Sequence, residues 1–195
     1  MNAQRSLQDL SPQVVPMTAT AVRMLDENGF FGYDDNRHEL VNGVLLMTPP
    51  PGTGHFYVEG RANRALNRAL MTSGLFETHF VQTGGAFRID DHTLLGPDMM
   101  IVPVPSIPGE VTSESIIALI EISGSSRTND LGPKAKIYAH AGIADYWVLD
   151  VAAKSVIVHR NPVDGAYISV QSFKAPSSLT CALLPDLTVQ IMDLF

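Results

Sequence analysis

Two acidic residues and one lysine in the middle of the chain stand out for the chemistry that they could perform together. Asp98 follows a proline at the start of one predicted strand, and Glu121 lies near the end of the next predicted strand. Lys134 follows in a predicted helix. Carboxylate oxygens are the usual protein ligands of hard divalent cations. A bound cation can also activate the water that attacks a substrate. The three residues therefore suggest a metal-assisted hydrolytic site.

Periodicity explains how these side chains could meet. A strand alternates its faces, so Glu121 shares a face with Leu119 in a stretch that is otherwise apolar on both sides. An isolated buried carboxylate is costly, so Glu121 needs a cation nearby. Helical phasing places Lys134 on the apolar stripe with Tyr138, whereas Lys136 faces the opposite side. From the residues alone, a buried salt bridge is as good an interpretation of this set as a catalytic site.

The elements that must position this set belong to a mixed α/β fold. We expect a flexible N-terminal tail over 1–17 and a single domain over 18–195, built on one central mixed β-sheet flanked by helices. The predicted helices are a short one ending near 28, a long one at 55–72 and one at 133–141 opened by Pro133. The predicted strands are a hairpin at 39–47 turning at Asn42-Gly43, then 77–81, 85–89, 98–103, 116–122, 145–150, 155–160, 167–172 and 187–191.

Composition narrows the class of protein. A net charge of −7 argues against a simple nucleic-acid-binding module but less against a metal-dependent nuclease, whose carboxylates are neutralised by metal. Arg61, Arg64 and Arg68 form a basic stripe that is either a solvated helix face or a contact for phosphates. The single cysteine, Cys181, excludes an internal disulfide and is expected to be a small buried hydrophobe. Without an apolar leader or a membrane span, we expect a cytoplasmic protein.

The same residues carry a resemblance to a known family. The chain resembles the bacterial Uma-two family of restriction-endonuclease-like proteins, whose fold is that of the PD-(D/E)XK nuclease superfamily. The similarity covers about 18–195 and rests on the runs at 97–98, 121–126 and 130–150, on the hairpin at 39–43 with His55, and on the C-terminal runs at 184–189 and 193–195.

The resemblance implies a Mg²⁺-dependent DNA endonuclease, with Mn²⁺ as a possible substitute. Asp98 and Glu121 correspond to the metal ligands. Ser123 stands where the superfamily has its lysine, and Lys134 on the next helix is the implied equivalent. Glu39 is then a further ligand, a partner of the lysine or a surface charge, and His55 is a phosphate contact, a proton acceptor or a structural residue.

Two other functions remain open at this point. The first is a catalytically inactive nuclease fold kept for binding nucleic acid or protein, which the acidic charge and the serine at position 123 favour. The second is a metal-dependent hydrolase acting on another phosphoester. A homodimer is expected for the endonuclease, because cutting both strands of a duplex calls for two sites.

Overall fold

The computed structural model describes residues 15–32, 37–105, 111–124 and 126–195. Most of the predicted tail, residues 1–14, lies outside these ranges. The helices are α1 (Ala19–Glu27), α2 (Thr53–Thr72), α3 (Arg127–Asn129), α4 (Ala135–His140) and α5 (Ile191–Leu194), with a 3₁₀ turn at Ser113–Ser115 and a π-helical turn at Asp130–Lys134. In the described ranges, no helix is both long enough and apolar enough to cross a membrane.

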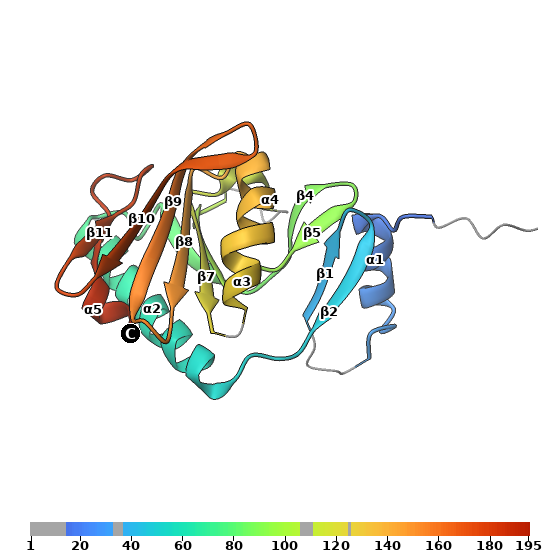
Figure 1. Cartoon of the computed structure of the whole chain (residues 1–195), viewed down its shortest axis with the longest axis horizontal. Coiled ribbons are helices and arrows are strands. Elements are labelled where there is room, and N and C mark those ends of the chain that lie inside the picture. Colours follow the sequence, from blue (N-terminus) through green and yellow to red (C-terminus); the bar gives the residue numbers. More distant parts are fainter. Residues whose placement is uncertain (1–14, 33–36, 106–110, 125) are drawn as a thin grey trace, which may run out of the picture.

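A six-stranded mixed sheet forms the centre of the molecule (Figure 1). Its strands, in spatial order, are β10 (Ala166–Lys174), β9 (Ser155–Val163), β8 (Asp145–Asp150), β7 (Ala118–Ser123), β6 (Met99–Pro103) and β3 (His79–Thr83). Among the strands of the described residues, only β7 and β8 pair in parallel, and every residue of both strands is buried. The predicted central mixed sheet is thus confirmed, and its central strands are the ones that are apolar on both faces.

Helices cover both faces of this sheet. The buried face of α2 packs with Ile120 and Ile122 of β7 in one core, whereas α4 packs with Leu119 in another. Successive residues of β7 therefore point into different cores. Glu121 follows the same alternation as Leu119 and faces the side of the sheet that α4 covers.

The prediction of one sheet was wrong for the N-terminal strands. β1 (Arg37–Val41) and β2 (Val44–Thr48) form the expected hairpin, and its turn residues Asn42 and Gly43 have φ angles of 50° and 78°. The hairpin pairs with the short strand β5 (Thr93–Leu95) and, through it, with β4 (Phe87–Asp90) in a separate four-stranded sheet. α1 packs on this small sheet around Leu40 and makes a core of its own.

The segment that carries Lys134 is helical from an earlier residue than predicted. It begins with α3 at Arg127, passes through the π-helical turn and continues as α4. Pro133 lies inside this run and not at its start. Because proline has no backbone N–H, it cannot donate the ordinary α-helical hydrogen bond. The wider turn occurs at the point where that bond is lost, and it buries both Asp130 and Lys134.

The C-terminal residues form a hairpin and a helical turn beside α2. β11 (Ser178–Thr180) pairs with β12 (Thr188–Gln190), and α5 follows directly, so the predicted strand at 187–191 is shorter than expected. Cys181 is 1% exposed between the two strands, and burial raises the pKa of its thiol to about 11.

We expect Cys181 to resist alkylation in the native protein. Thiolate is the reactive form, and both burial and the raised pKa reduce its availability. Labelling with iodoacetamide at pH 8, followed by mass spectrometry, should be at least about tenfold slower in the native protein than in urea. Equal rates in the two conditions would show that the C-terminal hairpin is not packed as described.

Candidate active site

Asp98 and Glu121 line the same pocket, at the end of the central sheet next to the small sheet. Asp98 immediately precedes β6, which runs antiparallel to β7. Its Oδ2 accepts a hydrogen bond of 2.6 Å from the backbone N–H of Ile122, the residue after Glu121. Both carboxylates are 2% exposed and line a pocket of 760 Å³ together with Lys134. The structure therefore brings the three predicted residues to one place.

Lys134 is bonded directly to the carboxylates. Its Nζ donates to Glu121 Oε1 at 3.0 Å and to Glu39 Oε1 at 2.9 Å. Burial alone would lower the pKa of Lys134, but the Glu121 and Glu39 charges raise it above its usual value, so the ammonium stays charged. Lys136 is exposed, as helical phasing predicts. Ser123 is buried near the end of the same strand as Glu121.

Glu121 is a strongly perturbed carboxyl group of the site. Burial and, to a lesser extent, the Asp98, Asp130 and Glu39 charges raise the pKa of its carboxyl to about 8, even though Lys134 acts in the opposite direction. The Tyr138 hydroxyl also donates to Glu121 Oε1, at 2.9 Å. Negative charge is thus in excess around Glu121, and the site would gain from an added cation.

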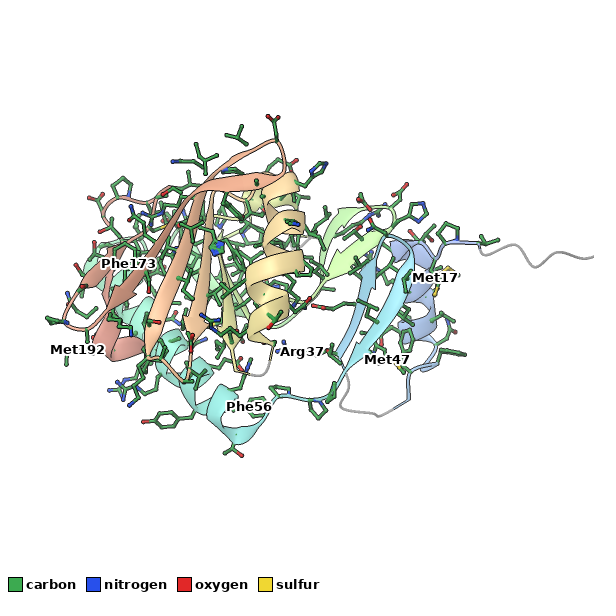
Figure 2. The ribbon with its side chains drawn as sticks, viewed as in Figure 1. Met17, Arg37, Met47, Phe56, Phe173 and Met192 are labelled. Atoms are coloured by element: carbon green, nitrogen blue, oxygen red, sulfur yellow. The ribbon has the colours of Figure 1, made fainter. Side chains whose placement is uncertain are left out.

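Arg37 is a site residue that sequence reasoning missed. Its Nη1 donates to Asp98 Oδ1 at 2.5 Å, and His55 Nε2 lies 3.3 Å from the same oxygen without the angle of a hydrogen bond. Figure 2 shows Arg37 in the region between the small sheet and the helices of the central sheet. Burial would raise the pKa of Asp98, but His55, Arg37 and the Ile122 N–H together lower it. Asp98 is accordingly an ionised carboxylate.

The small sheet supplies two of these groups because of strand alternation. Arg37 and Glu39 are two residues apart in β1, so both point toward the pocket. Glu39 is 4% exposed and also accepts a hydrogen bond of 3.1 Å from the Gly96 N–H, on the segment that leads to Asp98. Among the roles considered for Glu39, the structure places it as a partner of Lys134 and not as a surface charge of the hairpin.

Asp130 is a further buried carboxylate that lines the pocket. It is 2% exposed, and its Oδ2 accepts a hydrogen bond of 2.5 Å from the Ser126 hydroxyl. Burial raises its pKa. It lies four residues before Lys134, and the π-helical turn places both side chains inward. The four-residue spacing of Asp130 and Lys134 is visible in the sequence, but the sequence did not predict the π-helical turn that buries both side chains.

The carboxylates of the pocket suit a hard divalent cation that keeps much of its coordinated water. In the described residues, no three His, Cys, Asp or Glu side chains are arranged as a ready metal cage. Mg²⁺ commonly takes only one or two protein carboxylates and completes its shell with water and substrate phosphates. Asp98 and Glu121 supply two such carboxylates in an open pocket, and the excess negative charge at Glu121 favours a cation there. The residues present therefore fit a hard divalent cation.

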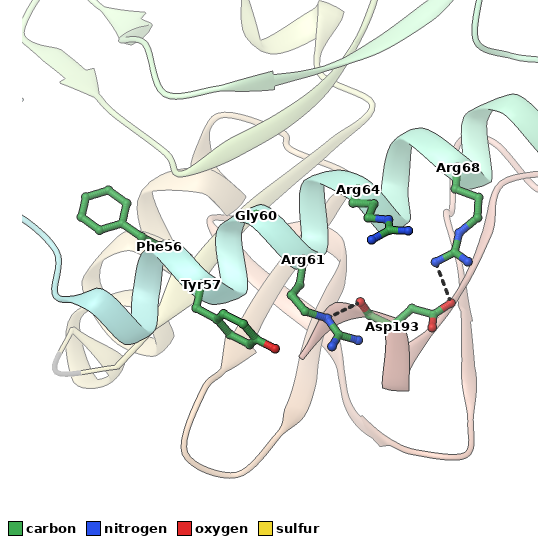
Figure 3. A pocket seen from close by; sticks show the side chains of 7 residues that line it. All are labelled: Phe56, Tyr57, Gly60, Arg61, Arg64, Arg68 and Asp193. Carbon is green, nitrogen blue, oxygen red and sulfur yellow. Dashed lines mark hydrogen bonds and ion pairs between the residues drawn. The ribbon is translucent and has the colours of Figure 1, made fainter.

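The basic stripe lies apart from this pocket. Arg61, Arg64 and Arg68 are on the outer face of α2, where they line a second groove with Asp193 of α5 (Figure 3). The aromatic residues Tyr138, Tyr146 and Trp147 are all buried, in agreement with the interpretation of these rings as core residues.

Comparisons with known proteins agree with this fold. Residues 29–192 match the Uma2 family, which is described as "Putative restriction endonuclease". One similar solved structure is that of "a putative nuclease belonging to DUF820" from Anabaena variabilis ATCC 29413, with a TM-score of 0.67 and 18% sequence identity. The alignment covers 88% of this chain and 96% of that chain. A search of curated proteins finds no match. Because the family match spans most of its length, the chain belongs to the Uma2 family of restriction-endonuclease-like proteins.

Proposed function

We propose that the protein is a Mg²⁺-dependent endonuclease that hydrolyses phosphodiester bonds in DNA. The observation that carries the proposal is the placement of Asp98 and Glu121 in one pocket, with the Lys134 ammonium 3.0 Å from Glu121. The family description and the solved nuclease of similar fold support the same reaction class. A buried salt bridge alone would not need an open pocket of 760 Å³ beside it.

Each residue has a role that follows from its contacts. Asp98 and Glu121 would hold Mg²⁺, which supplies a Lewis acid for the scissile phosphate and a bound water of lowered pKa. Lys134 is a permanent positive charge next to Glu121 and can orient the attacking water or stabilise charge that develops on the phosphate. Glu39 fixes the lysine from the other side. Arg37 neutralises Asp98, and its guanidinium lines the pocket, where it would contact a phosphate oxygen of the substrate.

Nicking of supercoiled plasmid DNA tests the proposal. We expect cleavage with Mg²⁺ or Mn²⁺ that stops with EDTA, and a loss of at least about a thousandfold in Asp98→Asn and Glu121→Gln. Both variants keep the shape of the side chain, and circular dichroism should show them folded. Asp186→Ala removes an exposed carboxylate and is the matched control, with unchanged activity expected.

Two results would contradict the enzyme. Equal nicking by wild type and by Asp98→Asn would mean that the activity comes from elsewhere. Binding of DNA without cleavage under either metal would favour the alternative, an inactive nuclease fold in which Arg37 and Lys134 permanently neutralise the carboxylates.

A further inference from the structure

A second groove runs along the outer face of α2 and is separate from the carboxylate pocket. It has a volume of 690 Å³ and lies between α2 and α5 (Figure 3). Its α2 side is lined by residues that share one exposed stripe of the helix; these are Phe56, Tyr57, Gly60, Arg61, Arg64 and Arg68, and we call this set the α2 track. The spacing of four, three and four residues from Tyr57 to Arg68 is that of one helix face.

The charge of the groove is opposite to that of the whole protein. Three guanidiniums face a single carboxylate, that of Asp193, whereas the full chain carries a net charge of −7. Arg61 Nε lies 3.4 Å from the Asp193 carbonyl oxygen, and Arg68 Nη2 lies 3.4 Å from its carboxylate. These long contacts hold the two guanidiniums in place without neutralising the patch. A local excess of arginine on an acidic protein points to a polyanion as the ligand.

Two exposed aromatic rings indicate the kind of polyanion that this groove would bind. Phe56 and Tyr57 are two neighbouring aromatic residues in the lining of the groove, and they are 57% and 63% exposed. Figure 3 shows the Tyr57 ring beside the Arg61 side chain. Flat rings next to arginines form the stacking surface that unpaired bases use, whereas bases within a duplex already stack on one another. The combination favours a single strand over a double helix.

Along the chain, the α2 track directly follows the α2 residues that line the carboxylate pocket. Gly54 and His55 line the pocket, and Phe56 and Tyr57 are the next two residues of the same helix. Of the residues of the track, the two rings are therefore nearest to the pocket along the helix axis, and the arginines follow. Phe56 and Arg68 are twelve residues apart, which corresponds to about 18 Å along the helix axis.

We propose that the α2 track binds a single-stranded segment of DNA and leads it to the carboxylate pocket. The preferred substrate is then DNA with an unpaired strand, such as an overhang or a flap. The part of this inference that concerns cleavage rests on the proposed nuclease function, whereas binding of the strand does not.

Binding measured without metal tests the track independently of catalysis. In EDTA, fluorescence anisotropy should show tighter binding of a labelled twelve-nucleotide oligo-dT than of a blunt duplex of the same length. Tyr57→Ala should weaken oligo-dT binding about tenfold, since one stacking contact is lost. Replacing the three arginines by glutamine should lower the slope of log affinity against log salt by about 0.7 for each phosphate contact removed. Lys136→Gln removes an exposed cation from another helix and should change neither quantity.

Gly60→Leu separates loss of binding from loss of folding. A Cβ at Gly60 would meet no atom within 4 Å, and leucine is a better helix former than glycine, so this variant should melt at or above the wild-type temperature. Its side chain would nevertheless fill the floor of the groove and should weaken oligo-dT binding about tenfold. A folded Gly60→Leu or Tyr57→Ala variant that binds oligo-dT as the wild type does would overturn the proposal.

Cleavage then distinguishes the two proposals. A flapped duplex should be cut faster than a blunt one, and Gly60→Leu should remove this preference. Oligo-dT binding through the track without any cleavage would contradict the nuclease and leave the track supported. Cleavage that does not distinguish flapped from blunt DNA, in wild type and Gly60→Leu alike, would overturn the track and leave the nuclease supported.

Discussion

Replacing Lys134 by methionine is expected to cost about 3–5 kcal/mol of folding free energy at pH 8.5, because it removes one partner of a buried ion pair. Lys134 Nζ is the donor to both Glu121 and Glu39, and all three residues are buried. The two carboxylates would remain buried without the cation that now bridges them. The matched control is Lys136→Met on the exposed side of α4, which should change stability by less than about 0.5 kcal/mol.

The stability lost in Lys134→Met should be smaller at low pH than at high pH. The folded-state pKa of Glu121 is about 8, above its unfolded value near 4.5, so its charged form destabilises the fold and stability is lost as pH rises through that window. Lys134 lowers this pKa in the wild type, and its removal raises it further. The pKa of Lys134 is itself raised, so its favourable contribution is complete below pH 10. The penalty of Lys134→Met is therefore smaller at pH 5.5, where Glu121 is protonated in both proteins.

Urea unfolding at the two pH values measures this difference. The double variant Glu121→Gln/Lys134→Met should recover part of the stability lost at pH 8.5, because the uncompensated charge is gone. A penalty that is equal at pH 5.5 and 8.5, or no recovery in the double variant, would show that Lys134 stabilises the fold by packing and not by its charge. If Lys134 also assists the reaction, plasmid cleavage by Lys134→Met should fall by about a hundredfold or more.

Local rules of sequence predicted those parts of the fold that depend on neighbouring residues. The turn at Asn42-Gly43 was predicted because both residues tolerate positive φ, and α2 was predicted because apolar residues recur at helical spacing from Ala62 to Leu70. Strand β7 was identified as central because it is apolar on both faces. The inward direction of Lys134 followed from helical phasing alone.

Contacts between distant elements account for what was missed. Arg37 reaches Asp98 across 61 positions of sequence, and no periodicity indicates which strand of a hairpin faces a site. The hairpin belongs to a separate sheet because it pairs with β5, a strand of three residues that is too short to show alternation. The π-helical turn at Pro133 depends on a backbone hydrogen bond that is absent, which a side-chain pattern does not report.

An equally large loss of stability is expected away from the active site, at Asp145. This side chain is fully buried at the start of β8 and accepts four hydrogen bonds. Two come from Arg160, from Nε at 2.8 Å and from Nη2 at 3.1 Å. The other two come from Trp147 Nε1 and from the backbone N–H of Ala182, each at 2.7 Å. It thereby joins β8, β9 and the segment after β11. Asp145→Ala leaves a buried indole N–H, a backbone N–H and a guanidinium without their acceptor and should cost about 3–5 kcal/mol in urea unfolding.

The stability of Asp145 variants and the alkylation of their cysteine should identify Asp145 as the link between β8 and the C-terminal hairpin. Asp145→Asn keeps one acceptor oxygen and the shape of the side chain, so it should lose less than the alanine variant, while Asp186→Ala removes an exposed carboxylate and should lose almost nothing. Because Ala182 follows Cys181 directly, Asp145→Ala should also speed alkylation of the cysteine at urea concentrations where the rest of the protein is folded. A loss below about 1 kcal/mol, or alkylation that accelerates only with global unfolding, would mean that the hairpin is held by its apolar contacts with α2 and not by this carboxylate.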